Sequence, residues 1–86
     1  MAPTGNRPRL TVYSRAYCHL CDDMIAGLHS LQARVAFDFD VVDVDSDACL
    51  EERFGNDVPV LMHGERELCR HFLASGFLTD YLVKIR

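Results

Sequence analysis

The chain has 86 residues, of which 49% are hydrophobic and 26% are charged, and its formal net charge is −4. This length allows one domain, and the composition is that of a globular chain rather than a disordered one. The negative charge argues against nucleic-acid binding, which needs a basic face, and no apolar run approaches the roughly 20 residues of a membrane-spanning helix.

The N-terminal residues 1–8 lack the apolar run of a secretory signal, and we expect a disordered tail there, followed by one domain over residues 9–86. The four cysteines are Cys18, Cys21, Cys49 and Cys69. In a chain without a signal, this spacing favours cytoplasmic thiols over a framework of structural disulfides. We therefore expect a cytoplasmic protein, and a monomer is the default expectation for this size.

The first predicted element is a strand over residues 10–14, where apolar and polar residues alternate and most are β-branched or aromatic. A helix follows, because apolar residues recur at the three- and four-residue spacing of one helical face: Cys21, Met24, Ile25, Leu28 and Leu31. The motif Cys18-His19-Leu20-Cys21 therefore lies where the strand has ended and the helix begins.

Alternation over residues 37–45 predicts a second strand. A short helix follows it, and Asp45, Ser46 or Asp47 can supply its N-cap. Gly55 fits the position just beyond that helix, where a left-handed backbone is common.

The C-terminal part begins with a predicted strand over residues 58–62, with proline at its entrance. Residues 63–66 form a tight turn into a fourth strand, and the last helix begins at Ser75 or Thr79. The order β-α-β-α-β-β-α predicts an α/β fold in which a four-stranded mixed sheet carries helices on both faces.

The cysteine motif predicts redox chemistry. A cysteine at a helix N-terminus lies near free backbone N–H groups and the positive end of the helix dipole, which favour the thiolate that attacks disulfides. The three-residue spacing places both sulfurs on one helical face. Asp22 and Asp23 oppose ionisation of Cys18, whereas Arg15 favours it. We therefore predict a pKa of Cys18 that is lowered, but less than in a pair without these carboxylates.

Two other interpretations of the cysteines stay open. In one, Cys18 and Cys21 join two further ligands in a zinc site, namely Cys69 and His71, although this second half lacks the compact spacing of most such sites. In the other, the pair consists of small buried hydrophobic residues. Cys49 and Cys69 are expected to be structural, with a redox role also open for Cys69 because its strand lies beside the third strand.

With a Cys-x-x-Cys after the first strand and Val58-Pro59 opening a later one, the chain resembles the glutaredoxins. More narrowly, it is similar to the small glutaredoxin-like proteins with His-Leu between the cysteines, over about residues 9–86. The resemblance implies a thioredoxin-type fold and thiol–disulfide exchange, with Cys18 as the nucleophile and Cys21 as the resolving thiol. It also implies that Pro59 is a cis-proline facing the pair, and that the backbone of Val58 pairs with the bound thiol substrate.

The same resemblance implies that Arg15 contacts a glutathione carboxylate. The chain departs from the family at two points: residues 72–77 hold one glycine and no acidic residue, and Leu20 replaces an aromatic residue. Both departures weaken the case for glutathione binding, but the thiol–disulfide exchange chemistry depends on neither of these positions. The expected partner is a disulfide-containing protein or a glutathione mixed disulfide, with glutathione or a thioredoxin-type protein as reductant and no bound cofactor. The alternative function is a non-enzymatic module of this fold that binds a partner or zinc and carries regulatory thiols.

Overall fold

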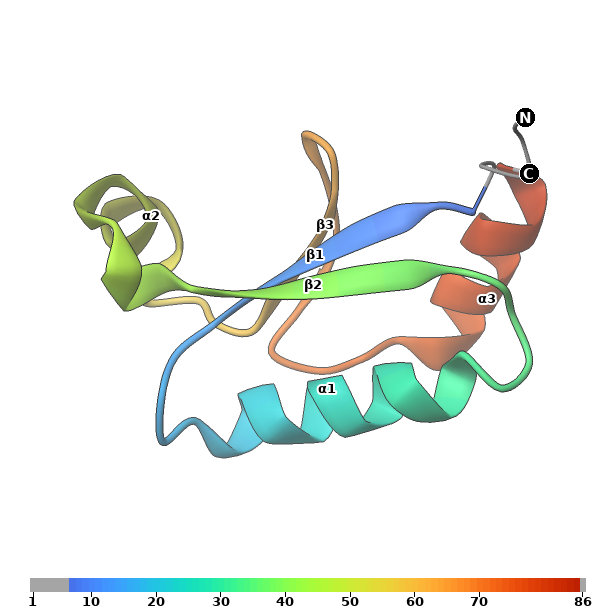
Figure 1. Cartoon of the computed structure of the whole chain (residues 1–86), viewed down its shortest axis with the longest axis horizontal. Helices are drawn as coiled ribbons and strands as arrows, with labels where there is room; N and C mark the ends of the chain where they lie inside the picture. The colour runs from blue at the N-terminus through green and yellow to red at the C-terminus, as the bar shows by residue number, and fades with distance from the viewer. Residues whose placement is uncertain (1–6, 86) are drawn as a thin grey trace.

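The structure is a computed structural model, and it describes residues 7–85. Its elements are β1 (Arg9–Ser14), α1 (His19–Leu31), β2 (Asp38–Asp43), the 3-10 turn η2 (Val44–Ser46), α2 (Ala48–Phe54), β3 (Val60–His63), β4 (Arg66–Arg70) and α3 (Ser75–Lys84) (Figure 1). The predicted order of strands and helices is confirmed.

The four strands form one sheet in the order β2-β1-β3-β4. Strand β1 runs parallel to β2 and antiparallel to β3, and β3 pairs with β4 in an antiparallel hairpin. The mixed sheet is therefore as predicted. Both outer strands carry charged residues, which are Asp38, Asp40 and Asp43 on β2 and Arg66, Glu67 and Arg70 on β4.

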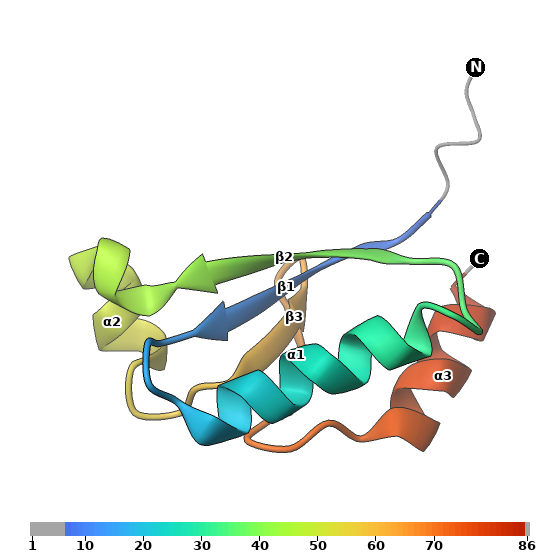
Figure 2. The same ribbon diagram turned by 60° about the horizontal axis from the view of Figure 1, so that its bottom comes forward.

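Alternation along the central strands divides the core between the two faces of the sheet. On one face, Leu10, Val12 and Leu61 pack with buried residues of α1 and α3, which lie together beneath the sheet (Figure 2). On the opposite face, Tyr13 and Val60 pack with residues of η2 and α2. Helices thus cover both faces, as the sequence predicts, and the buried side chains of the two central strands are shared between the two layers.

Strand β2 ends two residues earlier than the alternation predicts. The carboxylate of Asp43 accepts a hydrogen bond from the backbone N–H of Asp45 at 2.9 Å, which turns the chain into η2. Val44 is fully buried within this turn, so its apolar character reflects packing rather than a strand. Among the three predicted caps, Asp47 is the residue that caps α2, through the N–H of Cys49 at 2.8 Å.

The left-handed conformation predicted for Gly55 is wrong. Its φ of −54° continues the right-handed helix, and its N–H donates to the carbonyl of Glu51 at 2.8 Å. A Cβ on Gly55 would collide with that same carbonyl oxygen and with the Glu51 carboxylate. Glycine is needed here for close approach rather than for backbone freedom. Its carbonyl is used in the site described below.

Helix α3 begins at Ser75, the first of the two predicted starts. The N-cap residue is Ala74, which forms no side-chain cap, and the hydroxyl of Thr79 donates to the carbonyl of Ser75 at 2.8 Å. Burial of Leu78 and Leu82 against the sheet is what fixes this helix.

The expected tail covers residues 1–8, of which 1–6 lie outside the described residues. Arg7 is not loose: its guanidinium bonds to the carboxylate of Asp38 and, at 3.1 Å, to the carbonyl of Phe37. The carbonyl of Pro8 accepts from the N–H of Asp38 at 2.9 Å. Along residues 7–85, no helix has both the length and the apolar character needed to cross a membrane.

Candidate functional site

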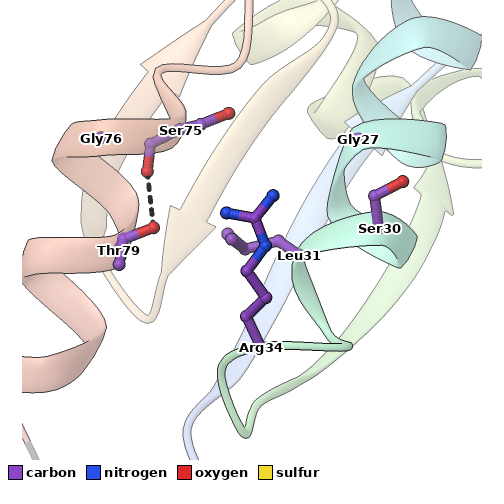
Figure 3. Close-up of a pocket in the computed structure, with 7 residues that line it drawn as sticks. All are labelled: Gly27, Ser30, Leu31, Arg34, Ser75, Gly76 and Thr79. Carbon is purple, nitrogen blue, oxygen red and sulfur yellow. Dashed lines mark hydrogen bonds between the residues drawn. The ribbon is translucent and has the colours of Figure 1, made fainter.

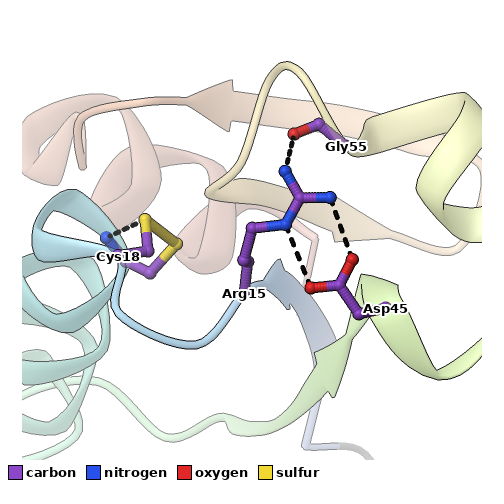
Figure 4. Close-up of a disulfide and its surroundings, with 5 residues drawn as sticks. Arg15, Cys18, Asp45 and Gly55 are labelled. Carbon is purple, nitrogen blue, oxygen red and sulfur yellow. Dashed lines mark hydrogen bonds and ion pairs between the residues drawn. A yellow bond between two sulfur atoms is a disulfide. The ribbon is translucent and has the colours of Figure 1, made fainter.

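Cys18 and Cys21 form a disulfide at the start of α1 (Figure 4). Strand β1 ends at Ser14, and Cys18 is the N-cap residue of the helix. The first turn of the helix brings the two Cα atoms to 5.2 Å from each other. The predicted location of the pair, at the junction of a strand and a helix, is confirmed, and the structure shows its oxidised form.

The two sulfur-bearing residues differ in access to solvent. Cys21 is 1% exposed, whereas Cys18 is partly exposed. The sulfur of Cys18 accepts a hydrogen bond from the backbone N–H of Cys21 at 3.2 Å. An incoming thiol or disulfide can therefore reach Cys18 but not Cys21, and a backbone donor already faces the accessible sulfur.

Val58 and Pro59 lie next to the start of the cysteine loop. In the antiparallel register, Tyr13 pairs with Val60, and continuing that register places Pro59 beside Ser14. The Val58–Pro59 peptide bond is cis, and Pro59 is buried. No hydrogen bond joins the backbone of Val58 to another residue between positions 7 and 85, whereas the Pro59 carbonyl accepts from His71.

Arg15 makes its contacts within the protein. Its guanidinium forms two hydrogen bonds to the carboxylate of Asp45, at 3.1 and 2.9 Å, and one to Glu51 at 3.2 Å. A fourth bond, at 2.9 Å, reaches the carbonyl of Gly55. In Figure 4 the guanidinium points toward Gly55 and Asp45, not toward the disulfide. The hydrogen bonds and charges of the two carboxylates raise the pKa of Arg15, and the hydrogen bond from Arg15 lowers the pKa of Asp45.

Tyr17, next to Cys18, is a site residue that the sequence analysis did not identify. Its side chain is fully exposed, and its φ of 59° lies in the left-handed region that non-glycine residues rarely occupy. Asp22, on the first turn of α1, and Asp23, which follows it, are also exposed. The surroundings of Cys18 therefore combine an aromatic ring with negative charge.

Comparison with known proteins identifies the family. The model of the Glutaredoxin-like domain (DUF836) family matches residues 9–83. The chain belongs to this glutaredoxin-like family. No curated protein matches the chain.

Solved structures similar to this glutaredoxin-like chain agree with that assignment. It is 37% identical to protein Ne2328 from Nitrosomonas europaea, with a TM-score of 0.79 over 95% of this chain and 99% of that one. It is 38% identical to protein XcR50 from X. campestris, with a TM-score of 0.67 over 87% and 96% of the two chains. Thioredoxin 1 from Thermosipho africanus, at 17% identity, has a TM-score of 0.61 over 91% of this chain and 99% of its own. This last likeness shows the thioredoxin fold alone.

A hollow of about 300 Å³ opens beside the cysteine pair of this glutaredoxin-like chain. It lies between the first half of α1 and the β4–α3 loop, and its lining is Leu20, Asp23, Met24, Gly27, His71, Phe72, Leu73 and Ser75. Leu20 comes from between the two cysteines, and Phe72 is 69% exposed. The loop approaches α1 closely, because a Cβ on Gly27 would come within 2.7 Å of Leu73 Cδ2. The hollow is mainly apolar, with Asp23 as its acidic residue.

A second hollow, of about 310 Å³, lies further along α1 and faces the start of α3. Figure 3 shows Arg34 extending between the two helices, with Ser30 on α1 and Ser75 and Thr79 on α3. No cysteine contributes to this hollow. It adjoins the first hollow, with which it shares Gly27 and Ser75, but Leu20 does not line it.

The zinc site that the sequence left open is not assembled. Within residues 7–85, no three His, Cys, Asp or Glu side chains are grouped so that they could hold a metal ion. Cys69 is a free, partly buried thiol packed against the core, and burial raises its pKa. Cys49 is a free thiol exposed on α2. The structure thus joins Cys18 to Cys21 and leaves the other two cysteines apart.

Proposed function

We propose that this chain is a thiol–disulfide oxidoreductase that works by dithiol exchange through Cys18 and Cys21. The observation that carries the proposal is the asymmetry of the pair: one accessible sulfur at a helix N-terminus is bonded to one buried sulfur. The family and fold shown above are consistent with redox chemistry. The exchange activity itself is the proposal.

In the reduced protein, the thiolate of Cys18 attacks one sulfur of a substrate disulfide. The other substrate sulfur leaves as a thiolate and takes up a proton, and a mixed disulfide remains on Cys18. Cys21 then loses its proton and attacks the sulfur of Cys18, which releases the second substrate sulfur as a thiolate. The substrate gains two electrons, and the protein is left with the Cys18–Cys21 disulfide. A reductant with two thiols, or two molecules with one thiol each, reverses these steps.

We propose that Val58 and Pro59 form the opposite wall of the site. The backbone N–H and C=O of Val58 have no hydrogen-bond partner among residues 7–85, and the strand register brings this segment beside the loop that leads to Cys18. A peptide-like substrate would pair with these backbone groups and place its disulfide against the accessible sulfur.

The proposed substrate is a protein disulfide or a glutathione mixed disulfide, and the proposed reductant is glutathione or a thioredoxin-type protein. The mainly apolar hollow beside Leu20 favours a polypeptide with an apolar side chain near its cysteine. Chemical-shift mapping with glutathione tests whether glutathione binds at this site. If it binds, the amide signals of the residues around Cys18 and Val58 shift; if they do not shift, a protein substrate is favoured. We further propose a cytoplasmic monomer, to which the free thiols Cys49 and Cys69 are suited.

Reduction of insulin and of a glutathione mixed disulfide by wild type, Cys18→Ser, Cys21→Ser and Cys49→Ser tests the function. We expect Cys18→Ser to be inactive, Cys21→Ser to accumulate a mixed disulfide on Cys18, and Cys49→Ser to match wild type. If the wild type reduces neither substrate with either reductant, the proposal is wrong, and the non-enzymatic module becomes the better description.

A further inference from the structure

Arg15 links two loops that border the exchange site. It lies just after β1 and three residues before Cys18. Its partner Gly55 ends α2 and lies three residues before Val58. The bond from Arg15 to the Gly55 carbonyl, at 2.9 Å, thus connects the loop of the nucleophile to the segment that leads into the Val58–Pro59 wall.

The carboxylates around Arg15 occupy most of its hydrogen-bond donors and compensate its charge, which disfavours binding of a substrate anion. The carboxylate of Asp45 accepts hydrogen bonds from Nε and Nη2 of Arg15, and the carboxylate of Glu51 accepts a third from Nη2. One positive charge therefore faces two negative charges. Four of the five guanidinium N–H groups are engaged, so a carboxylate on the substrate would find one free donor and would be repelled by both carboxylates.

We propose that Arg15 is a positioning residue, which fixes the cysteine loop relative to the Val58–Pro59 segment through Asp45 and Gly55 and does not bind a carboxylate of the substrate. This inference rests on the proposed exchange function. It replaces the role that the family resemblance implies for Arg15.

Helix α2 has a second attachment to the sheet, so we expect variants at Arg15 to keep the fold. The rings of Tyr13 and Phe54 stack with their centroids 4.2 Å apart, and the side chain of Phe54 is buried. What Arg15 adds is a polar link outside this apolar cluster, at the edge nearer to Cys18. Loss of the link is expected to loosen the spacing of the two loops without unfolding α2.

The test compares two disulfide substrates with the same peptide backbone: glutathione disulfide and its glycine ethyl ester, which lacks the glycyl carboxylates. Reduced wild type, Arg15→Lys and Asp45→Asn are oxidised by each substrate in single turnovers. If Arg15 positions the loops, both variants lose about tenfold or more in rate, and by the same factor with both substrates. The matched control is Arg9→Lys, because Arg9 pairs with Asp40 through two hydrogen bonds of 2.8 Å at the far end of β1. We expect it to react as wild type does.

Asp45→Asn decides between the two roles of Arg15. If Arg15 bound the substrate, removing a competing carboxylate would free the guanidinium and speed the reaction with the acid substrate alone. That result overturns the inference, as does a loss in Arg15→Lys confined to the acid substrate, or no change in either variant. If wild type reacts with neither substrate, the proposed function fails, which is a separate outcome. Thermal melts confirm that each variant is folded.

Discussion

The backbone N–H of Cys21 points at the sulfur of Cys18, with 3.2 Å between nitrogen and sulfur. The bond exists because Cys18 is the N-cap residue, whose side chain faces the unpaired N–H groups of the first helical turn. When the pair is reduced, the same donor can serve the thiolate of Cys18. In the proposed exchange reaction, the backbone of Cys21 would therefore help to activate Cys18 before the sulfur of Cys21 reacts.

The first prediction concerns ionisation of Cys18 in the reduced protein. The hydrogen bond from Cys21 and the helix dipole favour the thiolate, so its titration midpoint is expected below the ordinary value of ~8.5. Thiolate absorbance at 240 nm, compared with Cys18→Ser, measures it. Asp22→Asn removes a carboxylate from the first turn and should lower the midpoint further, whereas Asp80→Asn on α3 should not change it. A midpoint at or above ~8.5 contradicts this account.

The second prediction concerns the two free cysteines. Burial raises the pKa of Cys69, so it remains a thiol at pH 8, whereas Cys49 is exposed. In the oxidised protein, iodoacetamide should therefore modify Cys49 several-fold faster than Cys69. Peptide mass spectrometry at timed intervals gives both rates. In Cys49→Ser, the fast phase should disappear and only the slow modification of Cys69 should remain. Equal rates would show that Cys69 is more accessible than the structure indicates.

The third prediction concerns acid stability of the Arg15–Asp45 pair. The hydrogen bond from Arg15 holds the pKa of Asp45 below its usual value. A carboxyl group whose pKa falls on folding stabilises the protein above its unfolded-state value, and this contribution is lost as pH drops through the folded-state value. The melting temperature of wild type should exceed that of Asp45→Asn at pH 7, and the gap should close below about pH 4. A gap that stays constant to pH 2 would show that the ionisation of Asp45 is not what makes the wild type more stable than the variant.

The fourth prediction concerns the core. Phe37 is fully buried beneath the sheet, and Phe37→Ala is expected to cost about 3 to 5 kcal/mol in the free energy of unfolding. Phe72→Ala is the matched control, because Phe72 is 69% exposed, and its cost is expected within about 0.5 kcal/mol. Urea unfolding of both variants in the oxidised form measures the difference. Similar costs would argue against the burial described for Phe37.

Local patterns were enough to predict most of the fold and the cysteine pair. The location of Cys18 and Cys21 depends on a strand, a turn and a helical period within about 20 neighbouring residues, all of which alternation and spacing reveal. The same holds for the turn at Gly64, whose φ of 60° suits glycine. Alternation along β1 and β3 also predicts which of their side chains lie on each face of the sheet.

Features that depend on distant residues were not predictable in this way. The partners of Arg15 lie 30 to 40 residues further along the chain, and spacing within one element carries no information about them. Tyr17 and His71 adopt positive φ although neither is glycine, so no composition signal marks these loops. The acidic cluster at 43–47 could have indicated a partner for a nearby arginine, but not which one.

The charged residues of the two outer strands have a consequence for contacts with other polypeptides. An outer strand with free backbone groups invites another polypeptide to add to it and start an aggregate. Here β2 carries aspartates, two of which pair with Arg7 and Arg9, and β4 carries Arg66 and Arg70. The charged residues along both outer strands therefore disfavour strand addition at either edge of the sheet.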